Sequence, residues 1–173
     1  MPSVYVCPLS QVAATVASAN ASHLVSLIND TTLVVRPESI VEENHLFLGM
    51  NDIVEAQDGM ILPGEEHVSR LIGFASRWDR SRPIVVHCYA GISRSTAGAF
   101  ITMCLARPDR SEKAIAERLR QLSPFATPNA RIVAIADDLM GRQGRMVDAI
   151  AAIGRGADAY ESIPFFMPLE EQE

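Results

Sequence analysis

The hydrophobic pattern of the chain alternates between short apolar runs and longer stretches with helical spacing. The strongest strand signal is Ile84-Val85-Val86, an uninterrupted β-branched run typical of a strand buried on both faces. Weaker strand signals occur at 4–7, 23–28 and 45–48. Helical spacing predicts helices over 10–19, 65–80, 96–106, 111–122 and 129–153. Strands that alternate with helices predict an α/β three-layer sandwich, with a central, mainly parallel sheet of four to five strands flanked by helices.

The ends of these elements follow local chemistry. Ser10 precedes the first helical run and is predicted to be its N-cap.

The chain is expected to form one domain over residues 1–173, with a loosely structured tail over 154–173. The tail contains the apolar cluster 165–167, which we expect to dock on the body of the protein or on a second subunit. The oligomeric state is left open.

Composition limits the function. The net charge of −6 disfavours binding to nucleic acid or to an anionic membrane, so an anionic ligand needs a local positive site. Three cysteines, Cys7, Cys88 and Cys104, are too few for a disulfide framework and favour a reducing compartment. The chain lacks a secretory signal and a long apolar run, which together with the free thiols predicts a cytoplasmic protein.

Residues 87–95, His-Cys-Tyr-Ala-Gly-Ile-Ser-Arg-Ser, connect the strongest predicted strand to a helix. A loop that enters a helix N-terminus directs successive backbone N–H groups at one point, which suits a phosphate. Gly91 allows the loop to turn tightly, and Arg94 can place two N–H groups on phosphate oxygens. Cys88 lies at the strand end, where these positive groups favour its thiolate form. The segment predicts a nucleophile and an anion-binding site in a single loop.

The spacing of cysteine and arginine is weak evidence when taken alone. The same spacing recurs from Cys104 to Arg110, where Pro108 intervenes, glycine is absent and no strand precedes. Cys104 is therefore predicted to be a core thiol. For Cys88, the strand, the glycine and the helix together make a functional interpretation much stronger than that of a buried structural cysteine.

The run His87-Cys88-x-x-Gly91-x-Ser93-Arg94-Ser95 resembles the signature loop of the protein tyrosine phosphatase superfamily, and most closely its compact dual-specificity branch. The turn Leu122-Ser123-Pro124 with Pro128 and Asn129 is also similar to that branch. The resemblance covers roughly residues 40–140. The Asn-Arg-Tyr loop of the larger tyrosine-specific members is missing, which implies a shallower pocket.

The resemblance implies attack of the Cys88 thiolate on phosphorus and hydrolysis of a phosphocysteine intermediate. Ser95 would hydrogen-bond the sulfur, and His87 would support the loop rather than act as a base. No metal and no cofactor are expected. The phosphate oxygens would be held by Arg94 and by the amides of the loop, from Tyr89, Ala90, Gly91, Ile92, Ser93 and Arg94.

A general acid should protonate the leaving oxygen from a nearby loop. Asp52 directly follows the predicted strand 45–48, where the family places its acid, and Asp58 lies closer in sequence to Cys88. We favour Asp52, with Asp58 as the alternative and Glu55 as a more distant candidate. Each aspartate could also be an ordinary turn residue.

Other polar residues carry weaker hypotheses. His23, His45 and His67 lack metal-ligand spacing and are interpreted as strand-end or surface residues. The pair 137–138 is interpreted as a solvated helix face. Asn129 either positions the hydrolytic water or caps a helix.

The expected substrate is a phosphorylated protein, with phosphotyrosine first and phosphoserine or phosphothreonine second. A small-molecule or lipid phosphoester is the first alternative, but lipid-directed relatives tend to carry lysines in the loop, and residues 89–93 are uncharged. A rhodanese-like sulfurtransferase and an inactive phosphate-binding module are the remaining alternatives.

Overall fold

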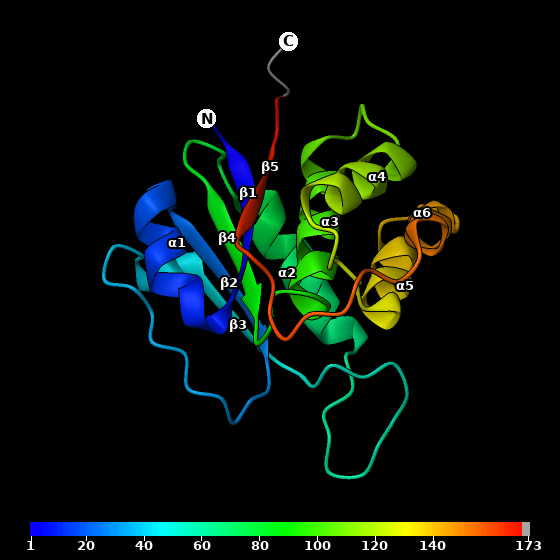
Figure 1. Cartoon of the computed structure of the whole chain (residues 1–173), viewed down its shortest axis with the longest axis horizontal. Coiled ribbons are helices and arrows are strands. Elements are labelled where there is room, and N and C mark those ends of the chain that lie inside the picture. Colours follow the sequence, from blue (N-terminus) through cyan, green and yellow to red (C-terminus); the bar gives the residue numbers. More distant parts are fainter. Residues whose placement is uncertain (171–173) are drawn as a thin grey trace.

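The computed structural model describes residues 1–170 and shows a five-stranded sheet between two helical layers (Figure 1). Its strands lie in the order β3-β2-β4-β1-β5. The first four are parallel, and β5 is antiparallel to β1. The strands are β1 (Ser3–Pro8), β2 (His23–Ile28), β3 (His45–Gly49), β4 (Ile84–Cys88) and β5 (Phe165–Pro168). The predicted α/β fold with a mainly parallel sheet is confirmed.

The helices divide unequally between the two faces of the sheet (Figure 1). Helix α1 (Val12–Ala19) covers one face, where a small apolar cluster includes Val16 and Val85. The larger core lies on the other face, around Phe100 and Leu71. The helices on that side are α2 (Glu65–Arg77), α3 (Arg94–Ala106), α4 (Glu112–Leu122), α5 (Ala130–Leu139) and α6 (Arg145–Ile153). None of the helices in residues 1–170 has the length and apolar character to cross a membrane.

Two predicted helix boundaries are wrong. Ser10 is not an N-cap: a short 3-10 turn covers Leu9–Gln11, α1 begins at Val12, and the Ser10 hydroxyl instead donates to the carboxylate of Glu161. A local serine signal could not reveal this partner, because it lies at the other end of the chain. The helix predicted to reach residue 80 ends at Arg77.

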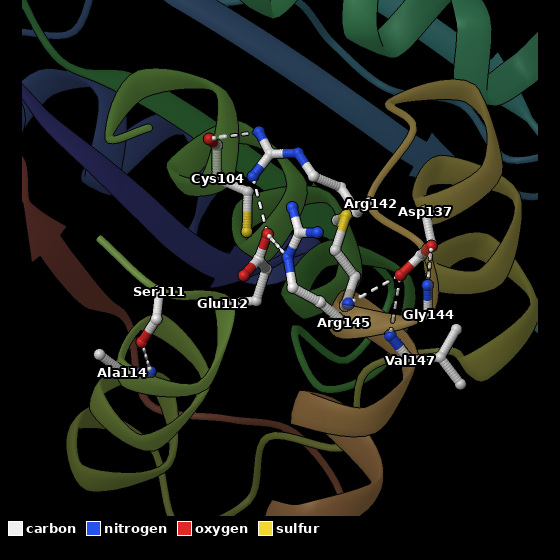
Figure 2. A network of polar contacts seen from close by, with 10 residues as sticks. Cys104, Ser111, Glu112, Ala114, Asp137, Arg142, Gly144, Arg145 and Val147 are labelled. Atoms are coloured by element: carbon white, nitrogen blue, oxygen red, sulfur yellow. Dashed lines mark hydrogen bonds and ion pairs between the residues drawn. The ribbon is translucent and has the colours of Figure 1, made fainter. Parts of the chain in front are cut away.

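The single helix predicted over 129–153 is two helices, α5 and α6. The chain between them passes through positive φ angles at Gly141 and Gly144, which interrupt the helix. Asp137 is buried rather than solvated, so its assignment to a solvated face is wrong. Its carboxylate accepts hydrogen bonds from the N–H groups of Gly144, Met146 and Val147 and caps α6 (Figure 2).

A second carboxylate ties the same helices together. Glu112, at the start of α4, is buried and lies between the guanidinium groups of Arg142 and Arg145 (Figure 2). Arg142 also donates to the backbone oxygen of Cys104 in α3. This network stabilises the helical layer away from the signature loop.

The C-terminal tail is more ordered than predicted. Residues 165–168 form β5, which pairs with β1, and Phe166 stacks on Tyr5 with ring centroids 5.0 Å apart. The apolar cluster 165–167 therefore docks on the body of its own chain. The pairing could not be seen in the sequence, because only the fold brings the two ends of the chain together.

The parallel strands determine where a site can form. The C-terminal ends of β1, β2, β3 and β4 lie at one edge of the sheet, and the segments that follow them meet there. The segment after β4 is the signature loop, residues 88–94. This edge is the usual location of ligand sites in parallel α/β sheets.

Candidate active site

The signature loop is held from outside by its carbonyl groups. Four of these carbonyls accept hydrogen bonds from backbone N–H groups of three separate segments. The pairs are Tyr89 O with Leu9 N at 3.0 Å, Ala90 O with Ser162 N at 2.8 Å, Ile92 O with Thr127 N at 2.9 Å and Ser93 O with Asn129 N at 3.2 Å. In a trans peptide the N–H points opposite to the C=O, so outward carbonyls turn the next N–H groups inward. The loop therefore presents amides to a common centre, as an oxyanion site requires.

The Cys88 thiol lies at this centre, almost fully buried at the end of β4. The N–H of Gly91 donates to its sulfur at 3.3 Å. The Ser95 hydroxyl lies 3.1 Å from the same sulfur, so the predicted contact between these residues is present. Gly91 has a φ of +71°, which favours glycine.

Arg94 is the first residue of α3 and is 7% exposed. Its Nη1 donates to Asn29 Oδ1 and to the backbone oxygen of Met50, both at 2.7 Å. These two acceptors directly follow β2 and β3, so the sheet edge orients the guanidinium. The buried Nε has no hydrogen-bond partner among residues 1–170. A buried unpaired donor is costly, and a phosphate oxygen at this position would satisfy it.

His87 connects the loop to a buried chain of hydrogen bonds. Its Nδ1 lies 3.1 Å from the backbone oxygen of Cys88, and its Nε2 lies 2.6 Å from Ser26 Oγ. Ser26 Oγ in turn lies 2.9 Å from Nε2 of His45. Burial lowers the pKa of His87 to about 4, and the nearby His45 and Arg94 act in the same direction. His87 is therefore neutral at pH 7 and does not act as a general acid at that pH.

The protons in this chain can be assigned by elimination. A carbonyl oxygen only accepts, so Nδ1 of His87 carries the proton. Nε2 of a neutral His87 is then an acceptor, and the Ser26 hydroxyl donates to it. Because Ser26 has a single proton, its oxygen accepts from the Nε2–H of His45. His45, the first residue of β3, is thus part of the support for the loop, so its interpretation as a strand-end residue is confirmed and its contact with Ser26 is an additional role.

Asp52 reaches the signature loop. Its Oδ1 accepts hydrogen bonds from Ser93 Oγ at 2.8 Å and from Asn129 Nδ2 at 2.9 Å. Asn129 is also the N-cap of α5, because its Oδ1 accepts from the N–H of Ile132. The capping role predicted as one alternative for Asn129 is confirmed. Asp52 is exposed, as are the other candidate acids, Asp58 and Glu55, which lie in the loop that follows it.

The two other cysteines contrast with Cys88. Cys104 is buried within α3, and burial raises the pKa of its thiol to about 12. Cys7 is buried on the α1 side of the sheet, and burial likewise raises its pKa to about 12. Both remain protonated at neutral pH, so neither acts as a nucleophile. The prediction that Cys104 is a core thiol is confirmed.

Several supporting residues could not be identified from the sequence. Asn29 directly follows the predicted strand 23–28, and this position was the only available signal. Ser26 and His45 lie on adjacent strands, so their contact depends on the strand order β3-β2-β4. Ser162 lies in the tail, and nothing in its sequence context indicates that it contacts the loop.

Comparison with known proteins finds a family match over part of the chain. The family model for protein-tyrosine phosphatase matches residues 59–125. No curated protein sequence matches the chain. The signature loop and the helix that leads into it both lie within the matched segment.

Solved structures with the same fold have low sequence identity. DUSP15 is 18% identical with a TM-score of 0.61, and the match covers 88% of this chain and 91% of that chain. Human DUSP28 is 14% identical with a TM-score of 0.62 and coverage of 88% and 96%. PTPMT1 in complex with PI(5)P is 14% identical with a TM-score of 0.61 and coverage of 88% and 94%. The chain thus shares the fold of compact dual-specificity phosphatases, and its residues 59–125 match the protein-tyrosine phosphatase family model.

Proposed function

We propose that the protein hydrolyses phosphate monoesters through a phosphocysteine intermediate, with phosphotyrosine in proteins as its main substrate. The observation that carries the proposal is the orientation of the signature loop. Four of its carbonyls are bound on the outside, and the N–H of Gly91 donates to the sulfur of Cys88. This arrangement places a nucleophile at the base of an anion-binding site, which phosphoryl transfer requires.

In the first step, the Cys88 thiolate attacks phosphorus in line with the leaving oxygen. The S–P bond forms, the P–O bond to the leaving group breaks, and Asp52 gives its proton to the leaving oxygen. Arg94 and the amides of residues 89–94 hold the three equatorial oxygens. The bonds from Ser93 and Asn129 to Oδ1 leave the second carboxyl oxygen of Asp52 available to carry that proton.

In the second step, water attacks the phosphocysteine and the S–P bond breaks. The Asp52 carboxylate accepts a proton from the water, which restores the acid for the next cycle. Ser95 stabilises the departing sulfur anion through the contact of 3.1 Å. His87 holds the backbone at Cys88 in place and takes no part in proton transfer.

The substrate preference rests on the residues of the loop. Residues 89–93 are uncharged, so the loop supplies no additional cations for a second phosphate. A single phosphate on a protein side chain fits this charge better than a polyphosphorylated headgroup. PTPMT1, whose fold is similar, was solved with PI(5)P, so a lipid or small phosphoester with one phosphate on its headgroup is the second candidate. The three buried free cysteines support a reducing, cytoplasmic location.

The activity can be tested with an aryl phosphate. Turnover should be insensitive to chelators, blocked by vanadate and abolished in Cys88→Ser. Phosphotyrosine peptides, phosphoserine peptides and vesicles with PI(5)P should then be compared by kcat/KM. Turnover of thiosulfate without turnover of any phosphate ester would refute the proposal, and faster hydrolysis of PI(5)P than of every peptide would replace the main substrate with the second candidate.

The acid can be identified with two matched variants. Asp52→Ala should lower kcat by about 10²- to 10⁴-fold, with the largest loss for leaving groups of high pKa. Asp58→Ala, in the same exposed loop, should change kcat by less than about twofold. Equal effects of the two substitutions would contradict the assignment of Asp52.

A further inference from the structure

The segment between α6 and β5, residues 154–164, passes beside the signature loop; we call it the C-terminal strap. Figure 1 shows it crossing from α6 toward β5 in orange. It forms no helix or strand, yet it is bound to the body at several points. The N–H of Gly156 donates to Thr127 Oγ1 at 3.0 Å, and the Glu161 carboxylate accepts from the Ser10 hydroxyl at 3.0 Å.

One contact of the strap reaches the signature loop directly. Ser162 is 4% exposed, and its backbone N–H donates to the carbonyl oxygen of Ala90 at 2.8 Å. That carbonyl and the N–H of Gly91 belong to one peptide group and point in opposite directions. The N–H of Gly91 donates to the sulfur of Cys88 at 3.3 Å. Ser162 and Cys88 therefore bind the two sides of the same peptide.

The strap also leaves no space behind this peptide. A Cβ built on Gly91 would lie 2.4 Å from Ser162 Oγ and 2.8 Å from the backbone of β1. The strap thus packs against the α-carbon of the loop glycine. A rotation of the peptide between Ala90 and Gly91 would break the bond to Ser162 and move the Gly91 N–H away from the sulfur.

We propose that Ser162 is a positioning residue of the phosphate site: its backbone N–H fixes the peptide between Ala90 and Gly91, so that the Gly91 N–H faces the Cys88 sulfur and the phosphate. The effect on turnover rests on the proposed phosphatase function, whereas the effect on the sulfur does not. The strap acts through the loop and does not touch the reacting atoms. The strap is on this basis part of the support that orients the phosphate site.

The test removes the Ser162 N–H. Ser162→Pro deletes this donor. Ile163→Pro is the control: it introduces a proline one position later, where the backbone N–H has no hydrogen bond within residues 1–170. The measurements are the pH profile of Cys88 alkylation by iodoacetamide and kcat/KM on an aryl phosphate. Ser162→Pro should raise the midpoint of the alkylation profile by about one pH unit and lower kcat/KM about 10- to 100-fold. Ile163→Pro should leave both close to wild type.

Folding is checked by circular dichroism and thermal unfolding. If Ser162→Pro does not fold, replacement of the amide at residue 162 by an ester removes the same N–H and keeps the side chain. A folded variant of either kind with the wild-type alkylation midpoint would overturn the proposal, as would an equal shift in Ile163→Pro. If the wild-type protein hydrolyses no phosphate ester, the proposed function fails, and the alkylation profiles still decide the role of Ser162.

Discussion

The buried chain His45–Ser26–His87 gives a prediction that follows from hydrogen-bond geometry. Ser26→Ala removes the donor to Nε2 of His87, which is fully buried, and leaves that nitrogen unsatisfied. A buried polar group without a partner costs about 1–3 kcal/mol. His45 is only half-buried, so water can replace its lost partner and adds little to the cost. We expect the free energy of unfolding to fall by about 2 kcal/mol, which for a chain of this size lowers Tm by about 4–8 °C.

The assay is urea denaturation at pH 7, combined with nitrogen-15 NMR of histidine-labelled protein. In the wild type, His87 should be neutral with its proton on Nδ1. Ser26→Ala leaves the carbonyl of Cys88 in place, so the proton should stay on Nδ1 while Nε2 loses its donor. His45→Gln keeps an N–H toward Ser26 and should retain most of the stability, whereas His45→Phe should not.

Two results would refute the proton assignment. One is a wild-type His87 with its proton on Nε2, since the carbonyl of Cys88 would then face a bare nitrogen. The other is a loss of less than about 0.5 kcal/mol in Ser26→Ala, because a surface-like effect is incompatible with an unsatisfied nitrogen in the core.

Three further predictions follow from the same structure. Gly91→Ala should abolish turnover and destabilise the fold by at least about 1–2 kcal/mol, because φ is +71° and a Cβ would lie 2.8 Å from the backbone of β1; wild-type vanadate binding would contradict this. Acidification from pH 7 to pH 4 should lower the free energy of unfolding by up to about 3 kcal/mol through His87. The unfolded residue takes up a proton near pH 6.5, whereas the folded residue, with its pKa lowered to about 4, stays neutral over most of this range. In His87→Gln the part of the slope between pH 6.5 and 4 that is due to His87 should disappear from urea titrations. Asp137→Ala should cost about 2 kcal/mol through the lost cap of α6, while kcat/KM of the folded protein stays at the wild-type value; a large loss of kcat/KM would show that the helical layer is coupled to the site.

The chemistry of the signature loop is local and could be predicted from the sequence. A β-branched strand, a glycine-containing turn and a following helix lie within a single short segment. Their order alone fixes a sulfur, an arginine and a row of amides in one place. The second cysteine–arginine pair, from Cys104 to Arg110, has the same spacing but lacks the preceding strand and the glycine. Its cysteine is a buried core thiol, so the spacing alone does not make a site.

The sequence also predicted the α/β layers, because the hydrophobic period changes from strand to helix along the chain. It did not predict the break between α5 and α6, since apolar positions continue at helical spacing across the glycines. It assigned Ser10 to the wrong partner and Asp137 to a solvated face. In both cases the side chain binds groups that become neighbours only after folding.

The tertiary structure alone decided how the loop is held. The strand order places Ser26 between His45 and His87, and the shared edge of the parallel strands brings Asn29 and the backbone of Met50 to Arg94. The antiparallel pairing of β5 with β1 pulls the tail across the molecule and sets Ser162 against Ala90. Such contacts join residues far apart in sequence, and their hydrogen bonds depend on positions accurate to a fraction of an ångström. A linear pattern of residue types carries the chemistry of a short loop, but only the packed chain determines which distant groups orient it.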